Sequence, residues 1–354
     1  MSPRARTLGY AELARLRLRS QRLIGPRCPS PVDTVEWFGA LQAQDYAGAK
    51  WAVGQRTRAG TDAQLERALD DGAILRTHVL RPTWHFVAAS DLRALLQLSA
   101  ARVHAASVYV NRRVKLDDKT FAKGHAIFSQ ALRGGREQTR TELGRALAQG
   151  GIHADGLRLG QLIMHAELEA LLCSGRRRGK QFTYALLDER AAKPKPIARE
   201  HALALLTERY FQSHGPALAR DFAWWSGSTL AEANAGIELI AARLESIELD
   251  RKRYWFVPRS TSVPKSPSLQ LLPNYDEYLV AYRDRALTIG AQFPPPMAAG
   301  HNPLGNSVVL DGRVVANFRR IQAKAEVVIE VGRSSAPIAL LQKALDAYAE
   351  FLAQ

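Results

Sequence analysis

The sequence predicts a mainly helical α+β protein with three tandem winged helix-turn-helix domains and a β-rich C-terminal region that ends in a helix. Two observations lead to this fold class. A set of amphipathic helices followed by a β-hairpin occurs three times, at intervals of roughly a hundred residues. A Pro/Ser-rich connector then precedes several short β-rich segments. We place the domains at residues 1–89, 90–192, 193–258 and 259–354.

The first copy is defined by helix-capping residues and one hairpin. Ser30-Pro31 opens a helix as N-cap and first-turn proline, and the apolar helical pattern continues to Leu41. Thr61 begins a capping-box signature that opens the next helix. Two β-rich segments, 74–80 and 83–87, predict the hairpin that forms the wing.

The second copy has the most basic hairpin. Thr139 and Glu142 form a capping box, and the apolar stripe over residues 159–170 suits a recognition helix. Segments 171–173 and 181–186 predict the wing. Its tip carries four cations: Arg176, Arg177, Arg178 and Lys180. Such a wing would lie along DNA phosphates or enter a minor groove. The alternative is a solvated hairpin tip that stays clear of DNA.

The third copy follows a stiff linker, Lys193–Pro196, and leads into β structure. Helices over 197–212 and 229–242 precede a hairpin at 246–257. Further β segments are expected at residues 269–272, 307–310, 313–318 and 325–330, followed by a helix over 337–352. We expect these segments to form a small sheet or barrel packed against the third copy.

Composition restricts the class of function. The formal charge of +15 and the pI near 10.1 attract polyanions, of which nucleic acid is the commonest in a cytoplasm. A coding bias toward arginine is a second source of part of this surplus. Cys28 and Cys173 lack metal-site spacing and form no disulfide framework, which suits a reducing cytoplasm. No apolar run has the length for secretion or membrane spanning, so we expect a cytoplasmic, nucleoid-associated protein.

The segment Leu41–Tyr46 contains the most informative residues. Gln42 and Gln44 stand two residues apart at the predicted end of an apolar helix, and Gly48 permits that ending. On a continuing helix the two side chains would point roughly opposite ways, so they can serve one site only where the helix ends. Buried amides need hydrogen-bond partners, but at a cleft the pair could grip a base edge or hold a water molecule. A capped helix end with solvated side chains is the alternative.

Five blocks of sequence carry a family resemblance. They are Trp37–Tyr46, residues 74–78 with 81–87, Gly215–Gly227, Leu271–Leu279 and Asp311–Val315. In this order they span nearly the whole chain and resemble the AlkZ/YcaQ-like DNA glycosylases, also described as winged-helix DNA-binding proteins. Gln42-Ala43-Gln44 is similar to the Gln-x-Gln motif of the AlkZ-like branch. The resemblance implies a concave DNA-binding surface made by the three winged helices, with a C-terminal β-barrel.

The activity that the resemblance implies is excision of alkylated purines, including the unhooking of interstrand crosslinks made by DNA-reactive natural products. An N7- or N3-alkylated purine already carries positive charge, so it leaves without a general acid. The carbonyl oxygens of Gln42 and Gln44 would orient a water and face the developing charge on the sugar. Asp45 is a supporting candidate, as a cap or as a brace for Gln44. Lys50 has no surrounding motif for a Schiff base, so we expect a monofunctional glycosylase.

The first hairpin supplies weaker candidates. His85 is a possible supporting residue that could contact the lesion or a phosphate, as could His78, with a structural hydrogen bond as the alternative for each. Arg76 and Arg81 are candidates for phosphate contacts.

The expected partner is double-stranded DNA with alkylated purines, bound by a monomer without a cofactor, metal or membrane. His301-Asn302 has no third ligand at metal spacing, and the chain has no phosphate-binding G-x-x-x-x-G-K-[ST] loop. Trp224 and Trp225 are expected in the core of the third copy. Two other functions stay open: a non-catalytic winged-helix regulator or architectural DNA binder, and a resistance protein that sequesters a genotoxin.

Overall fold

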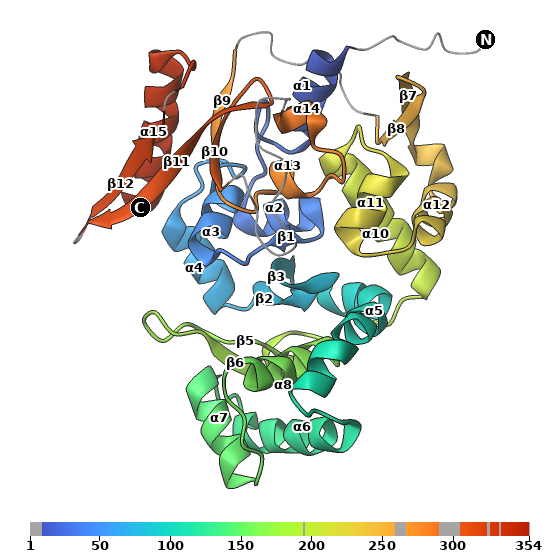
Figure 1. Cartoon of the computed structure of the whole chain (residues 1–354), viewed down its shortest axis with the longest axis vertical. Coiled ribbons are helices and arrows are strands. Elements are labelled where there is room, and N and C mark those ends of the chain that lie inside the picture. Colours follow the sequence, from blue (N-terminus) through green and yellow to red (C-terminus); the bar gives the residue numbers. More distant parts are fainter. Residues whose placement is uncertain are drawn as a thin grey trace. The chain divides into compact units, whose positions relative to one another are not determined.

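The computed structural model describes residues 9–193, 195–258, 267–289, 305–323, 326–332 and 334–353. These residues form a mixed α/β protein, about half of it helical (Figure 1). They divide into two compact units. The first unit comprises Met1–Leu65, Ala204–Trp225 and Thr229–Gln354, and the second comprises Glu66–Leu203 and Ser226–Ser228. The mixed fold class is confirmed, whereas the tandem winged-helix arrangement and the four domain boundaries stay predictions.

The first unit combines short helices with a C-terminal sheet. Its helices are α1 (Tyr10–Ser20), α2 (Pro31–Phe38), α3 (Tyr46–Gly54), most of α10 (Arg199–His214) and of α11 (Ala219–Ser226), α12 (Leu230–Leu239), η1 (Ala241–Arg243), α13 (Glu277–Val280), α14 (Ala286–Ile289) and α15 (Ile338–Ala353). Helix α4 (Asp62–Asp70) begins in the first unit and ends in the second. The hairpin of β7 (Glu245–Leu249) and β8 (Lys252–Phe256) follows η1, as the third copy of the sequence pattern predicts.

The C-terminal sheet has four antiparallel strands in the order β12-β11-β10-β9 and curls visibly (Figure 1). Its strands are β9 (Leu269–Leu272), β10 (Asn306–Leu310), β11 (Arg313–Ala323) and β12 (Glu326–Val331). Asp311 and Gly312, both at positive φ, form the two-residue turn between β10 and β11. A side chain at Gly312 would clash with the Tyr278 hydroxyl and with Ala14, so glycine is required there. The predicted β-rich C-terminal region is confirmed.

Helix α15 is anchored to the first unit through Trp51 of α3. The Trp51 ring packs against Tyr348 and Phe351 of α15, with ring centroids 4.6 and 5.3 Å apart. Its indole N–H donates to the Leu271 carbonyl of β9 at 2.6 Å. Helix α3 therefore contacts both the last helix and the C-terminal sheet.

The second unit alternates helices and hairpins. Its strands are β2 (Ile74–Val79), β3 (Arg81–Ala88), β4 (Gln138–Thr139), β5 (Leu172–Ser174) and β6 (Thr183–Leu186). Its helices are α5 (Leu92–Arg113), α6 (Asp118–Leu132), α7 (Arg140–Gln149), α8 (Gly156–Leu168) and α9 (Leu187–Arg190). Strands β2 and β3 form one antiparallel hairpin, and β4, β6 and β5 form a second sheet in that order. Apolar side chains of α6, α7 and α8 share one buried core, which includes Phe128, Leu143 and Leu162.

The predicted capping residues occupy their predicted places. Ser30 accepts a hydrogen bond from the Asp33 amide at the start of α2, next to Pro31. The Thr139 and Glu142 side chains and backbone amides bond reciprocally at the start of α7. These local patterns were readable from sequence because each cap involves residues only three positions apart.

The end of α2 was predicted wrongly. The helix does not reach the two glutamines but ends at Phe38, because Gly39 adopts a left-handed φ of 79° and its N–H bonds back to Val35 and Glu36. The chain then runs into a short strand, β1 (Leu41–Gln42). Gly48 does not end a helix either, since it lies inside α3. The pair Gln42 and Gln44 therefore lies between two helices.

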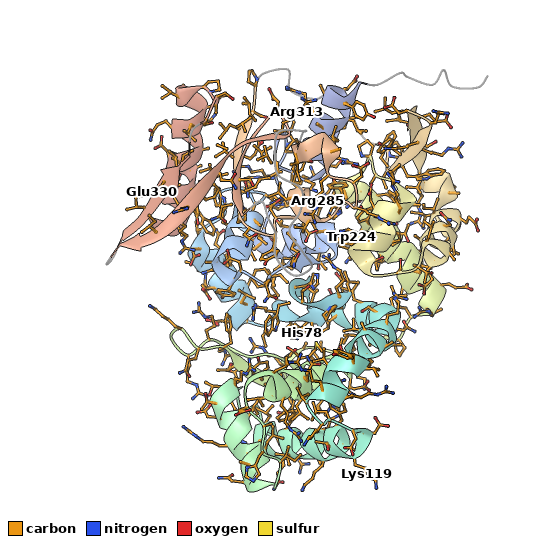
Figure 2. The ribbon with its side chains drawn as sticks, in the orientation of Figure 1. His78, Lys119, Trp224, Arg285, Arg313 and Glu330 are labelled. Atoms are coloured by element: carbon orange, nitrogen blue, oxygen red, sulfur yellow. The ribbon has the colours of Figure 1, made fainter. Side chains whose placement is uncertain are left out.

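The two neighbouring tryptophans of α11 differ from the expectation. Trp225 is fully buried, as predicted, but Trp224 is 45% exposed, so its prediction as a core residue was wrong. Trp224 is labelled in Figure 2, and its indole N–H donates to the Val280 carbonyl at 3.1 Å. Adjacent positions on a helix point about 100° apart, so only one of the two can face the core.

A fully buried ion pair joins α3 to the start of α13. Arg56 donates to both oxygens of Asp276 at 2.7 and 2.8 Å, and neither side chain is exposed. The remaining N–H groups of Arg56 donate to the Gln21 side chain and to the backbone carbonyls of Gln21 and Ala52. A buried guanidinium with all of its donors satisfied holds these segments in one arrangement.

We expect Asp276→Asn to lower the free energy of unfolding by about 3–5 kcal/mol, because it leaves the Arg56 charge buried without its counter-charge. Urea denaturation of both proteins measures the difference. The matched control is Glu248→Gln, in an ion pair with Arg253 whose side chains are 65% and 57% exposed. It should cost at most about 1 kcal/mol. Equal losses in the two variants would contradict this assignment.

Candidate functional site

The two glutamines of the Gln-x-Gln segment lie in the first unit, on the accessible side of an irregular segment. Leu41 and Ala43 are buried, whereas Gln42 is half-buried and Gln44 is exposed. This alternation is typical of extended backbone, in which residues two apart point to the same face. Extended backbone therefore allows Gln42 and Gln44 to face one side, without the helix end that the sequence predicts.

Asp45 is the N-cap of α3. Its carboxylate accepts a hydrogen bond from the Gly48 amide at 3.2 Å, and the side chain is otherwise exposed. A carboxylate at this position also interacts favourably with the positive end of the helix dipole. The contacts of Asp45 are therefore those of a helix cap.

A second sequence block lies directly against this cap. A side chain at Gly48 would come within 2.6 Å of the Asp45 carboxylate and 2.9 Å of the Pro273 ring. Pro273 begins the turn that carries Asp276 and Glu277, so two of the blocks used for the family resemblance are in contact. Gly48 is needed here for this close approach.

Glu277 fixes the backbone of the glutamine segment from behind. One of its carboxylate oxygens accepts the Gln42 amide N–H at 2.7 Å. The other accepts the indole N–H of Trp225 at 2.8 Å and lies 3.3 Å from Nε2 of His214. Glu277 and its two further partners, Trp225 and His214, are all buried. Because charged hydrogen bonds are short and directional, the position of Gln42 is well defined.

His214 is enclosed by aromatic rings. Its ring stacks on Tyr210 with centroids 4.6 Å apart and meets Phe38 edge-on at 5.2 Å. Burial lowers the pKa of His214, while the nearby Glu277 carboxylate opposes this shift. The sequence predicts no role at this site for Glu277, Trp225 or His214, because only tertiary contacts bring them together.

The candidates on the first hairpin lie in the second unit. Arg76 is buried, with its guanidinium 4.5 Å from the Trp84 ring centroid and 4.4 Å from that of Phe182. His85 is fully buried, and its Nδ1 lies 2.9 Å from the Thr83 carbonyl oxygen. Arg81 is half-buried at the start of β3. These placements favour structural roles for Arg76 and His85.

His78 is also buried in the second unit, where Figure 2 labels it. Its Nδ1 pairs with the Glu167 carboxylate of α8, and its ring centroid lies 4.5 Å from that of Trp84. The contact joins the β2–β3 hairpin to α8. A structural hydrogen bond, the alternative raised from sequence, is what the structure contains.

The four cations of the β5–β6 hairpin tip differ in their contacts. Arg178 forms a two-pronged ion pair with Glu142 at 2.9 and 3.0 Å, and Arg177 pairs with Glu66 at 3.1 Å. Arg176 donates to the Asp70 carbonyl at 3.2 Å, while its side chain is exposed. Lys180 is exposed next to Gly179, which has a positive φ. The three arginines therefore hold the hairpin tip through these contacts, and they also contribute its positive charge.

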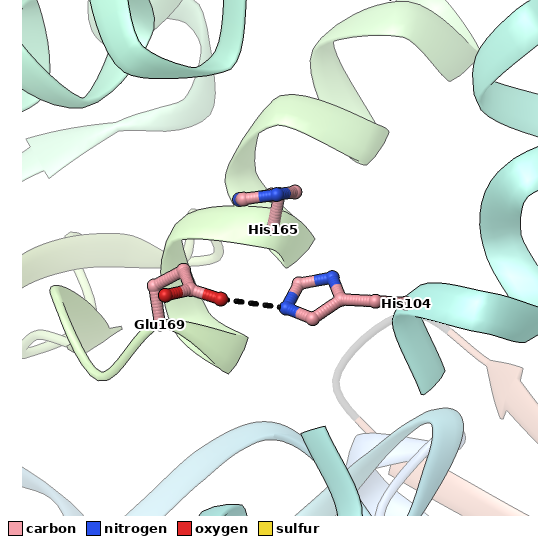
Figure 3. Close-up of side chains that lie close together, drawn as sticks. All are labelled: His104, His165 and Glu169. Carbon is pink, nitrogen blue, oxygen red and sulfur yellow. Dashed lines mark hydrogen bonds and ion pairs between the residues drawn. The ribbon is translucent and has the colours of Figure 1, made fainter. Parts of the chain in front are cut away.

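A cluster of metal-ligand side chains lies elsewhere in the second unit. His104, His165 and Glu169 place one potential ligand atom each within 4.8 Å of one another (Figure 3). Sequence reasoning missed the cluster because its members come from separate helices, and only His165 and Glu169 share a helical spacing. His301 and Asn302 lie outside the described residues.

The basic chain, the helix–hairpin elements and the accessible neutral amides are together typical of a protein that acts on DNA. The family model for "DNA glycosylase AlkZ-like" matches residues 35–354. The chain therefore belongs to the AlkZ-like family and is a DNA glycosylase, which confirms the family resemblance and the prediction of an enzyme. Membership of this family argues against the alternative function, a non-catalytic DNA-binding regulator.

A solved DNA glycosylase structure shares the fold over nearly the whole chain. Streptomyces sahachiroi DNA glycosylase AlkZ superimposes with a TM-score of 0.79 at 20% sequence identity, covering 98% of this chain and 97% of that one. Comparison with curated protein sequences gives no match. Among the described residues, no helix combines the length and apolar character needed to cross a membrane.

We expect Arg178→Ala to raise the pKa of Glu142, which the Arg178 hydrogen bonds hold at about 2, toward its ordinary value of 4.5. Because the folded-state pKa is the depressed one, the interaction stabilises the fold above pH 4.5 and is lost as pH falls through about 2. A carbon-detected NMR titration of the Glu142 carboxyl group measures the shift. Arg177→Ala is the matched control and should leave this pKa in place. An unchanged pKa in Arg178→Ala would contradict the ion pair.

Proposed function

We propose that this DNA glycosylase hydrolyses the N-glycosidic bond of N7- or N3-alkylated purines, with Gln42 and Gln44 holding the nucleophilic water. The observation that carries the proposal is an accessible pair of neutral amides on one face of a segment whose backbone is bonded to buried Glu277. The proposal extends to bulky adducts and interstrand crosslinks as substrates.

The chemistry suits neutral amides. An alkylated purine is cationic and leaves readily, so the enzyme must mainly stabilise an oxocarbenium-like sugar and deliver water to its anomeric carbon. Two amide oxygens can accept hydrogen bonds from one water and direct a lone pair toward that carbon. The same carbonyl dipoles favour the positive charge that develops on the sugar. Neither step requires a general acid.

The backbone contacts of Gln42 support a preorganised site. A catalytic amide is effective only when its oxygen is held in the productive geometry before the reaction begins. Glu277 is itself held by Trp225 and lies against His214, so the anchor of Gln42 is buried and rigid. We assign Glu277 as a positioning residue and Asp45 as the cap that orients the start of α3 next to Gln44.

The surroundings of Lys50 support a monofunctional enzyme. Its ammonium group lies 2.7 Å from the Asp62 carboxylate and 5.1 Å from the Tyr46 ring centroid. The amine is thus engaged by an ion pair and a cation–π contact, whereas a Schiff-base lysine must be available to attack the sugar. We therefore infer hydrolysis by water without a covalent lysine intermediate.

We further propose that the three helix–hairpin sets are winged helices with the domain boundaries given above, and that the chain binds duplex DNA as a monomer. The support is the repeated order of helices followed by a hairpin at β2–β3, β5–β6 and β7–β8. In the second copy, the exposed cations Arg176 and Lys180 are the residues best suited to phosphate contacts.

The double substitution Gln42→Ala and Gln44→Ala should lower the rate of excision by at least about 100-fold, because it removes both groups that orient the water. The assay uses a duplex with a single N7-alkylguanine, followed by hot alkali, which breaks the strand at each abasic site. DNA affinity, measured in parallel, should stay close to that of the parent protein.

The control for this experiment is Gln149→Ala, which removes an exposed glutamine from the last position of α7. It should retain full activity. Full activity of the double variant would show that the site assignment is wrong, even though the family assignment stands.

Lys180→Ala should weaken DNA binding and lower the slope of log affinity against log salt concentration by about 0.9, the value for one lost phosphate contact. Fluorescence anisotropy over a salt series measures both quantities. The matched control is Lys119→Ala, in the first turn of α6, whose side chain extends into solvent (Figure 2). If both variants lose the same slope, the wing has no special role in binding.

A further inference from the structure

Three helices of the second unit bring three histidines and a glutamate together. His104 lies on α5, His125 on α6 and His165 on α8, and Glu169 is the C-cap of α8. Figure 3 shows His104 and Glu169 facing each other, with the His165 ring beside them. The proposed glycosylase chemistry uses none of these residues.

Direct contacts define the cluster. His104 Nε2 lies 2.8 Å from a carboxylate oxygen of Glu169, and the rings of His104 and His165 have centroids 4.5 Å apart. Nδ1 of His165 lies 3.1 Å from Nε2 of His125. Phe121 stacks on the His165 ring at 3.9 Å and 18°, which limits rotation of that ring. The cluster is therefore ordered, and its three histidines are half-buried.

The donor set and its spacing suit a metal ion. His165 and Glu169 are four residues apart, which places them on one face of a helix. The potential ligand atoms of His104, His165 and Glu169 all lie within 4.8 Å of one another. Ligand atoms on a tetrahedral zinc ion are roughly 3.3 Å apart, as follows from bonds of 2.0–2.2 Å. Small rotations of the half-buried His104 and the exposed Glu169 side chains can provide this difference.

We propose that His104, His165 and Glu169 form a zinc-binding site, with water as the fourth ligand. Imidazole nitrogen with one carboxylate oxygen is a common zinc donor set, and it disfavours magnesium, which prefers oxygen ligands alone. His125 is a positioning residue that holds the second ring nitrogen of His165, as partners of metal-binding histidines do. The bound ion would join α5 to α8 and stabilise the second unit.

The test is equilibrium binding of Zn²⁺ to the metal-free full-length protein, by isothermal titration calorimetry with elemental analysis after dialysis. We expect one ion per chain and a higher melting temperature with Zn²⁺ than without it. His104→Ala and Glu169→Gln should each weaken binding by at least about 10–100-fold, and His125→Ala by about 10-fold. Mg²⁺ should not compete.

The matched control is His153→Ala, which removes an exposed histidine from the same unit. It should bind Zn²⁺ like the parent. Glu169→Gln changes an exposed side chain and should fold normally, so its loss of binding reports on the site itself. Absence of stoichiometric binding, or equal binding by the parent and Glu169→Gln, would overturn the proposal. These measurements involve no DNA, so their outcome is independent of the glycosylase mechanism.

Discussion

Two neighbouring carboxylates, Asp276 and Glu277, are buried in the first unit and hold the glutamine segment through different partners. Asp276 forms the ion pair with Arg56 at the end of α3, while Glu277 accepts the amide of Gln42 just before α3 begins. Both ends of the α3 region are thereby tied to one short turn. Burying two acids is unfavourable unless each is matched by donors, so the partners and the turn depend on one another.

This constraint matters for the proposed site, because the side chains of Gln42 and Gln44 are uncharged. Amide oxygens provide no strong charge of their own, so their effect depends on being held in a fixed direction. The chain supplies this through Glu277 and Trp225 behind Gln42, and through the Asp45 cap ahead of α3. Gln42 is half-buried and Gln44 is exposed, while Glu277, which holds the Gln42 backbone, is shielded from water.

Local features could be predicted from sequence to the extent that they depend on residues close together in the chain. The caps at Ser30 and Thr139 involve partners three residues away, and the strand pattern of residues 307–318 ends at an Asp-Gly turn that is typical of hairpins. The end of α2 was misplaced because the apolar pattern continues past Gly39 into buried Leu41 and Ala43. Those two residues are buried in a strand-like segment, and periodicity over so few residues cannot distinguish the two cases.

The sequence by itself determined the family, the basic character, and most helices and hairpins. It also singled out Gln42 and Gln44 as the candidate site residues. All of these follow from local pattern and from motif residues. Only the tertiary structure decided that Glu277 holds the backbone of Gln42 and that Arg177 and Arg178 pair with Glu66 and Glu142. The same is true of the contact of His104 with His165 and Glu169. Each of these depends on contacts between segments tens to hundreds of residues apart. Such contacts arise from the packing of whole elements, which no short stretch of sequence encodes.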